Sequence, residues 1–431
     1  MMSNSNEHFQ FTDERFADLQ MLRYRLNGFE DLTLSQQIYI YCLAKATLMG
    51  RDITFDQQGK YNLRIRKTLE AIYKHYDGDR TSDDFKALEV YLKRVWFSSG
   101  IYHHYGCEKF KPGFSEHFFY EAVSMMPETE LPLKRGETKE DLLDELVPVI
   151  FDEEILPKRV NQTDGVDLVA TSACNFYEGV TQNEVERFYA KLKDGEDLTP
   201  PSYGLNSKLM KRNGEIVEMT WKEEGMYGTA IKEITSWLLK AQKYAENEQQ
   251  AHVIDLLIKY YRTGDLSDFD RYSIAWVKQQ EGMVDFINGF IEVYGDPLGL
   301  KGTWEGLVEF KDMKATRRTQ AISQNAQWFE DHSPVAPQFK KAEVKGVTAH
   351  VICAAMLGGD EYPASAIGIN LPNANWIRET HGSKSVTIGN LTEAYNKAAP
   401  VLTMFSPGSA GNGSWGKGVT AGAILRTISA G

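Results

Sequence analysis

One short segment places an acidic and a phenolic side chain where together they could bind a charged group. Glu292 and Tyr294 are two residues apart in a run expected to be a β-strand. Both side chains then lie on one face of the strand, while Ile291 and Val293 point to the other. A carboxylate beside a phenol can bind an ammonium group. The alternative, a carboxylate on the solvent side of a half-buried strand, needs no ligand.

Two amide side chains form a second candidate. Asn370 and Asn373 flank the dipeptide Leu371-Pro372. Because proline imposes an extended conformation on the residue before it, both amides could face the backbone of an extended chain and bond to it. The alternative is that the asparagines only cap a turn.

A third group, His103, His104 and Cys107, carries side chains that ligate metals. Imidazole and thiolate groups a few residues apart can share one ion. The alternative is an aromatic loop with solvated histidines. None of the nine histidines has the spacing H-E-x-x-H, H-x-H or H-x-x-x-H, so the residues themselves predict no zinc site.

The elements that must position these residues follow from hydrophobic periodicity and turn signals. Asn213-Gly214 predicts a two-stranded ribbon over residues 206–220, and Gly295-Asp296-Pro297 predicts a turn between two strands over residues 287–308. A structured aromatic loop is expected at 102–119, and a buried strand at 344–356. Helices are expected over residues 13–93, 128–158, 231–262 with a break near Asn247, and 316–330.

The composition indicates a soluble globular protein. Hydrophobic residues make up 42% of the 431 residues and charged residues 25%, which excludes disordered and low-complexity classes. The net charge of −12 and the absence of a basic run argue against nucleic acid as a partner. No apolar stretch approaches the roughly 20 residues that a membrane span needs, and no signal peptide is visible. A cytoplasmic location without membrane association is expected.

Several segments together resemble the dipeptidyl peptidase III family, whose members are zinc-dependent exopeptidases that remove dipeptides from peptide N-termini. The similarity covers about residues 10–399, and the sequence resembles the bacterial members more than the eukaryotic ones. The motifs that carry the resemblance are Asn175-Phe-Tyr177, Ala241-Gln-Lys-Tyr244-Ala245, Gly289-Phe-Ile-Glu-Val-Tyr294-Gly-Asp-Pro297, Gly302-x-x-Glu305-Gly306 and Gly368-Ile-Asn370-Leu-Pro-Asn373.

The resemblance implies an α+β, two-lobed dipeptidyl peptidase III-like fold: a lower lobe with a β-barrel core plus helices, and an upper helical lobe that holds zinc. The upper lobe is expected to be largely missing from this chain. Residues 1–312 are assigned to the lower lobe, 313–350 to a helical excursion of the upper lobe, 351–399 to further lower-lobe strands, and 400–431 to an atypical tail. That tail contains seven glycines and no acidic residue, and its segment Gly411–Gly418 only imitates a phosphate-binding loop.

The resemblance also assigns roles to the candidate residues. Glu292 and Tyr294 are expected to bind the free amino terminus of an oligopeptide, and Asn370 and Asn373 its backbone. Tyr105 is expected to form an aromatic wall of the cleft.

The zinc motif of the family, H-E-x-x-G-H, does not occur in the 431 residues. The intact family uses zinc, but none is expected in this chain, which is therefore expected to keep peptide-binding residues and to be inactive alone, through truncation before the zinc motif. The alternative is a non-catalytic peptide-binding protein.

Overall fold

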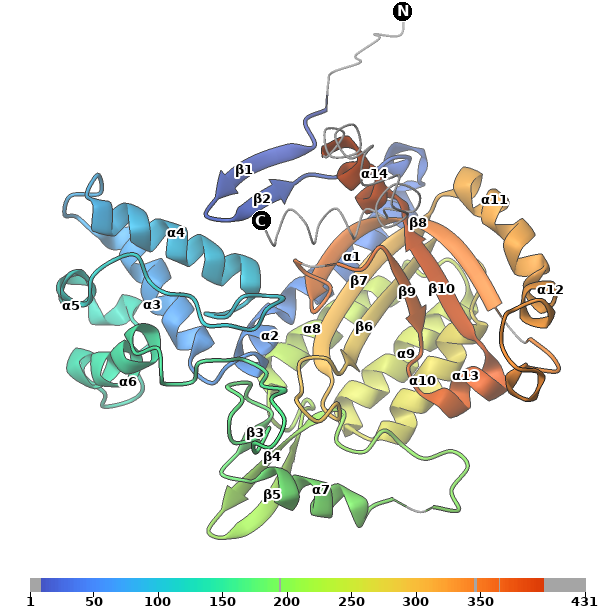
Figure 1. Cartoon of the computed structure of the whole chain (residues 1–431). Coiled ribbons are helices and arrows are strands. Elements are labelled where there is room, and N and C mark those ends of the chain that lie inside the picture. The colour runs from blue at the N-terminus through green and yellow to red at the C-terminus, as the bar shows by residue number, and fades with distance from the viewer. Residues whose placement is uncertain (1–8, 194, 345–346, 364, 399–431) are drawn as a thin grey trace, which may run out of the picture.

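A five-stranded mixed sheet forms the centre of the computed structural model, which describes residues 9–193, 195–344, 347–363 and 365–398 (Figure 1). Its strands β8 and β10 are parallel, and all other neighbours are antiparallel. In spatial order the strands are β6 (Val284–Glu292), β7 (Thr303–Lys311), β8 (Val347–Gly359), β10 (Ser383–Ile388) and β9 (Gly368–Leu371). The expected strands around the Gly295-Asp296-Pro297 turn and at 344–356 are therefore confirmed.

Helices pack against this sheet and bury it. The helix α1 contacts β6, β7 and β8, and α8 packs on both α1 and α9. Asn247 caps α9, since its side chain accepts a hydrogen bond from the N–H of Gln250 at 2.8 Å, which explains the predicted helix break. The helices of this layer are α1 (Leu34–Met49), α8 (Gly228–Gln242), α9 (Glu248–Thr263) and α10 (Leu266–Lys278).

A close approach of α1 to the sheet depends on two glycines. Gly306 of β7 and Gly358 of β8 are paired across the strands. A Cβ atom at Gly358 would lie 2.6 Å from the methyl carbon of Thr47, and one at Gly306 would lie 3.0 Å from it. The absence of both side chains lets the helix lie directly on the strands.

A second hydrophobic core belongs to a group of helices on one side of the sheet (Figure 1). Its largest members include Tyr91 and Phe119, and it draws only on residues 55–173. The helices of this region are α2 (Arg51–Gln57), α3 (Asn62–His75), α4 (Asp83–Ser98), α5 (Glu116–Met125) and α6 (Lys139–Phe151). The predicted helix within 128–158 is therefore present, and the aromatic loop predicted at 102–119 ends where α5 begins.

The remaining elements surround the two cores. The predicted ribbon is present as β4 and β5, joined by Asn213-Gly214. Elements not yet located are β3 (Tyr177–Glu178), β4 (Ser207–Arg212), β5 (Glu215–Thr220), α7 (Gln182–Ala190), α11 (Met313–Gln324), α12 (Ala326–Asp331), α13 (Asn375–His381), α14 (Gly389–Ala398) and the short 3-10 helices Phe29–Asp31, Glu128–Glu130 and Pro337–Phe339.

The prediction of a helix at the start of residues 13–93 is wrong. Residues 12–22 form a hairpin of β1 (Thr12–Phe16) and β2 (Leu19–Leu22), in which Phe16 pairs with Leu19. Ala17 has a φ of 49°, a left-handed conformation that turns the chain. Apolar residues at positions 16, 19 and 22 suit a helix, but the tight turn between Phe16 and Leu19 separates them onto two strands.

The mixed α+β class is confirmed, whereas the β-barrel core is not. Among the described strands the central sheet is open, with β6 and β9 at its edges. The domain limits at residues 312, 350 and 399 and the missing upper lobe stay predictions, and the tail 400–431 lies outside the described residues.

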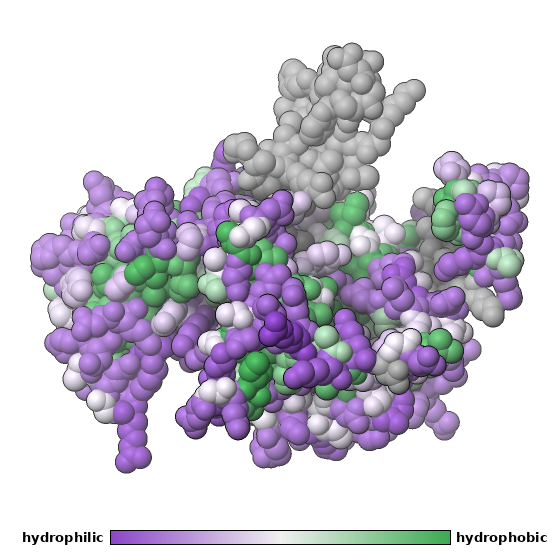
Figure 2. Space-filling model, turned by 60° about the horizontal axis from the view of Figure 1, so that its bottom comes forward, coloured by the Kyte–Doolittle hydropathy of each residue, from purple (hydrophilic) through white to green (hydrophobic). Residues whose placement is uncertain are grey.

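No helix of the described residues is both long and apolar enough to cross a membrane. The face in Figure 2 is mostly hydrophilic, with hydrophobic residues in separate patches.

Candidate functional site

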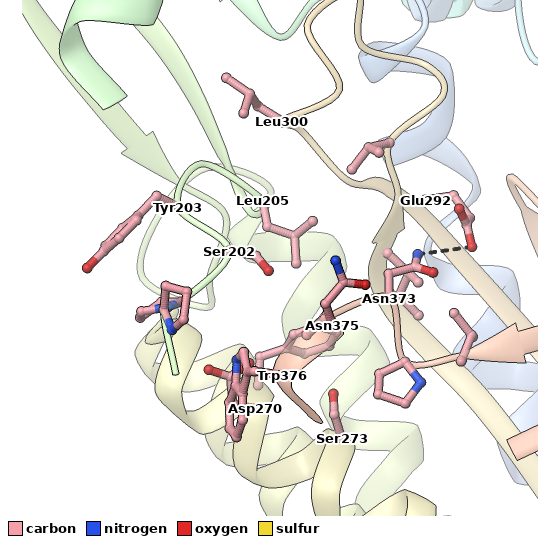
Figure 3. A pocket seen from close by; sticks show the side chains of 18 of the residues that line it. Ser202, Tyr203, Leu205, Asp270, Ser273, Glu292, Leu300, Asn373, Asn375 and Trp376 are labelled. Carbon is pink, nitrogen blue, oxygen red and sulfur yellow. Dashed lines mark hydrogen bonds between the residues drawn. The ribbon is translucent and has the colours of Figure 1, made fainter. Parts of the chain in front are cut away.

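The end of β6 presents the carboxylate of Glu292 to a cavity. Between Phe290 and Glu292 the pairing with β7 shifts register, so the strand is irregular at this end. Glu292 is partly exposed and accepts a hydrogen bond from Nδ2 of Asn373, with 3.2 Å between the atoms (Figure 3). Two of the residues singled out in the sequence therefore meet, although 81 positions separate them.

A buried aspartate shapes the chain just after Glu292. One carboxylate oxygen of Asp296 accepts hydrogen bonds from the N–H groups of Leu300 and Lys301, each at 2.8 Å. The same oxygen accepts one from the hydroxyl of Tyr177, also at 2.8 Å. These bonds fix the turn between β6 and β7, and hence the direction in which the chain leaves Glu292.

Tyr294 lies in that turn and not on the strand. Because β6 ends at Glu292, the argument that placed Glu292 and Tyr294 on one strand face is wrong. The side chain of Tyr294 is 82% exposed, and the residue still lines the same cavity as Glu292.

The two asparagines separate in space. Asn373 follows β9 and lines the cavity, together with Leu371 and Pro372. Asn370 is exposed on β9, where it pairs with Ser385 of β10, and it does not line this cavity.

Tyr105 also lies away from the cavity. It belongs to the loop between the bridged residues Tyr102 and Lys109, and it is 61% exposed. Its N–H donates to Nδ1 of His103 at 3.2 Å. Its expected role as a cleft wall is a prediction that this geometry leaves untested.

The cavity has a volume of about 960 Å³ and mostly apolar walls. It is bounded by α10, α13, the end of β6, the segment after β9 and a loop near residue 200. Its aromatic and apolar lining consists of Pro200, Pro201, Tyr203, Leu205, Phe269, Tyr272, Trp276, Ile287, Ile291, Val293, Tyr294, Leu300, Leu371, Pro372 and Trp376. Such a space, with a few polar groups in it, suits an organic ligand.

The sequence reasoning missed Asp270 and Ser273, which line the cavity from α10. Both residues are buried, as are Tyr272 and Trp276 of the same helix. The signal in the sequence was an aspartate on the apolar face of an amphipathic helix, which is unusual because carboxylates are rarely buried without a function or a partner.

Three further carboxyl groups influence the surroundings of Glu292. The pKa of Asp360 is raised to about 6, chiefly by burial; the charge of Arg159 opposes this rise and the charge of Glu292 adds to it. Burial, followed by the charges of Asp360 and Glu292, raises the pKa of Glu361 to about 8. The pKa of Glu305 is also raised by burial, and neither of its carboxyl oxygens has a hydrogen-bond partner among the described residues. These groups make the region around Glu292 electronegative once they ionise.

The candidate metal residues do not form a metal site. The rings of His103 and His104 stack with centroids 4.5 Å apart, and Sγ of Cys107 accepts a hydrogen bond from Arg159 at 3.4 Å. Across the described parts of the chain, no three His, Cys, Asp or Glu side chains gather in a group that could hold a metal ion. The described residues therefore do not fit the zinc that the resemblance implies.

Comparison with known proteins finds similarity to one peptidase family. The model of peptidase family M49 matches residues 201–409. Dipeptidyl peptidase 3 of Homo sapiens is 24% identical over 409 residues, which is 87% of this chain and 55% of the human protein. The chain thus spans about half the length of the curated relatives that it matches over most of its length.

Two solved structures share the fold. The structure of DPP III from Caldithrix abyssi has a TM-score of 0.60 and 19% identity, covering 85% of this chain and 57% of that one. The dipeptidyl-peptidase III from Corallococcus sp. strain EGB has a TM-score of 0.64 and 16% identity, covering 90% of this chain and 60% of that one. The match to peptidase family M49, the curated relatives and these two structures all indicate similarity to the dipeptidyl peptidase III family.

Proposed function

We propose that this chain binds oligopeptides by their free N-terminus, with Glu292 as the anchor of the ammonium group. The observation that carries the proposal is the Glu292 carboxylate at the rim of a large cavity, already oriented by Asn373. A carboxylate held in this way can form a charge-assisted hydrogen bond to an ammonium group. Tyr294 at the same cavity would add a phenol contact.

The backbone of the peptide would be held by the asparagines. Asn373 has a side-chain oxygen free to accept from a peptide N–H, because its Nδ2 atom is the one that faces Glu292. Asn370 lies on β9, an edge strand whose outer side has no partner strand among those described. An extended peptide along this edge would pass Asn370 before it reaches Asn373.

The 431-residue chain is proposed to bind peptides without hydrolysing them. Its sequence lacks H-E-x-x-G-H, and its described residues offer no zinc site. Hydrolysis of N-terminal dipeptides, with zinc, belongs in this proposal to the intact peptidase of the family. The same absence favours the second candidate, a non-catalytic peptide-binding protein, and release of dipeptides by the 431-residue chain would contradict both candidates.

The test is calorimetric titration of the chain with tetraalanine. Glu292→Gln should weaken binding about tenfold or more, because a charge-assisted contact contributes roughly 1.5–3 kcal/mol. Tyr294→Phe should weaken it less, since a neutral hydrogen bond contributes about 1 kcal/mol.

Glu233→Gln is the matched control, because Glu233 is exposed on α8 and does not line the cavity. It removes the same charge and should leave the affinity unchanged. If Glu292→Gln bound tetraalanine as well as the parent chain, Glu292 would not be the anchor.

A further inference from the structure

Besides Glu292, two carboxylates line the cavity, Asp270 on α10 and Glu379 on α13. Trp376, which also lines the cavity, comes from α13, a helix that packs against α10. Figure 3 shows Asp270 and Trp376 in a part of the cavity apart from the Glu292–Asn373 pair. We call this part, formed by Asp270, Ser273, Phe269 and Trp376, the Asp270 subsite.

Asp270 is largely buried, and its carboxylate has no hydrogen-bond partner among the described residues, although the charge of Arg271 acts on it. The residue is 8% exposed. Asp268 on the same helix is 2% exposed, and its carboxylate contacts Lys259 at 2.9 Å and Arg271 at 2.6 Å. Because Asp270 lines the cavity, a ligand there could supply a partner and offset the cost of holding this carboxylate in a largely buried position.

The surroundings of Asp270 suit the apolar part of a ligand. Phe269 and Tyr272 line the cavity from the same helix, and Trp276 follows one turn later. The Nε1 atom of Trp376 is buried without a hydrogen-bond partner in the described structure. Aromatic rings around a carboxylate favour a cation carried on an apolar body, because ring faces attract cations and apolar walls bury the rest.

We propose that the Asp270 subsite binds a cationic group carried on an apolar body, either a free arylalkylamine or a side chain of a bound peptide. Its ammonium group would pair with the Asp270 carboxylate, and its apolar part would lie against Trp376. Burial raises the pKa of Asp270 to about 7, and a bound cation would oppose this effect. The Asp270 subsite can be tested separately from the Glu292 anchor, because Asp270→Asn changes the subsite and keeps Glu292.

The experiment compares phenethylamine with 2-phenylethanol, its uncharged analogue, in calorimetric titrations of the full chain. The parent chain should bind the amine more tightly than the alcohol. Asp270→Asn should weaken amine binding about tenfold or more and leave alcohol binding unchanged, because only the charge contact is lost. Trp376→Leu is the second variant and should weaken both ligands, since it removes the aromatic wall.

Two controls keep the result specific. Glu233→Gln, which removes a charge outside the cavity, should leave phenethylamine binding unchanged. Thermal melting of Asp270→Asn shows that the variant is folded. The proposal is overturned if the parent chain binds the amine and the alcohol with equal affinity. It is also overturned if Asp270→Asn lowers the affinity for both ligands by the same factor.

A pair of peptides identifies the source of the cation. Lys-Ala-Ala-Ala and norleucine-Ala-Ala-Ala differ mainly in the side-chain charge. If Asp270→Asn abolishes a preference for the lysine peptide, the subsite serves a peptide side chain. If only phenethylamine depends on Asp270, the subsite serves free amines. Independence of both ligands from Asp270 contradicts the proposal.

Discussion

The carboxylates around Glu292 differ in their contacts although they lie close in the fold. Glu292 is partly exposed and bonded to Asn373, whereas Glu305 and Glu361 are buried with oxygens that have no partner among the described residues. Because burial disfavours the charged form, the buried acids hold their protons to a higher pH than a solvated carboxyl group does. Their ionisation therefore opposes folding.

This predicts a pH-dependent effect of Glu361→Gln on stability. The pKa of Glu361 is about 8 in the folded chain, above its ordinary value of 4.5. Between these two pH values the folded chain holds a proton on Glu361 that the unfolded chain has released. The contribution of protonated Glu361 to the free energy of unfolding is therefore fully present below pH 4.5 and is lost as the pH rises through 8. Glu361→Gln cannot ionise and should be more stable than the parent at pH 9 by roughly 1–3 kcal/mol.

Denaturant unfolding at pH 5 and pH 9 measures this difference. At pH 5 the difference in the free energy of unfolding between Glu361→Gln and the parent should be much smaller. Glu233→Gln should not differ from the parent at either pH. A Glu361→Gln variant that is less stable than the parent at pH 9 would show that the ionised carboxylate is favourably paired.

Among the helices and strands, those whose ends depend on a few adjacent residues were predicted correctly. Asn213-Gly214 gave the ribbon and Asn247 the break between α8 and α9, because a turn and a cap depend on a few adjacent residues. The hairpin at residues 12–22 was mistaken for a helix because its short strands carry apolar residues at a spacing that both structures allow. Strands were expected within residues 351–399, but no local pattern located β9 and β10 there, because they are short and pair across the sheet with other segments.

The contact between α1 and the sheet leads to a second prediction. Gly358→Ala places a Cβ atom 2.6 Å from the methyl carbon of Thr47, so the helix or the strand must move. We expect a loss of roughly 1–3 kcal/mol in the free energy of unfolding, as for other overpacked cores. Gly195→Ala is the control, because nothing lies within 4 Å of the added atom.

Thr47→Ser tests the cause. Serine removes the obstructing methyl group and keeps the hydroxyl that donates to the carbonyl of Leu43 at 3.1 Å. In the double variant, Gly358→Ala should therefore cost less than it does alone. Strict additivity of the two changes would mean that Thr47 is not the obstacle.

At the scale of the whole molecule, the site joins segments that no local pattern connects. Glu292 and Asn373 were identified from the sequence and meet in the fold, while Asn370 and Tyr105 lie outside the cavity and Asp270 was not foreseen. Arg159, from the segment that leads out of the helical core, lowers the pKa of Asp360 beyond the end of β8. Family resemblance supplied roles for single residues, but the cavity itself depends on how α10 and α13 pack.

The proposed function requires that the chain recognises the free amino terminus of a peptide. Calorimetric titration of the unmodified chain with tetraalanine and with N-acetyl-tetraalanine tests it most directly, because the two ligands differ only at the ammonium group. Tetraalanine should bind at least about tenfold more tightly than N-acetyl-tetraalanine, as expected for a charge-assisted contact. Equal affinity for the two peptides would contradict it.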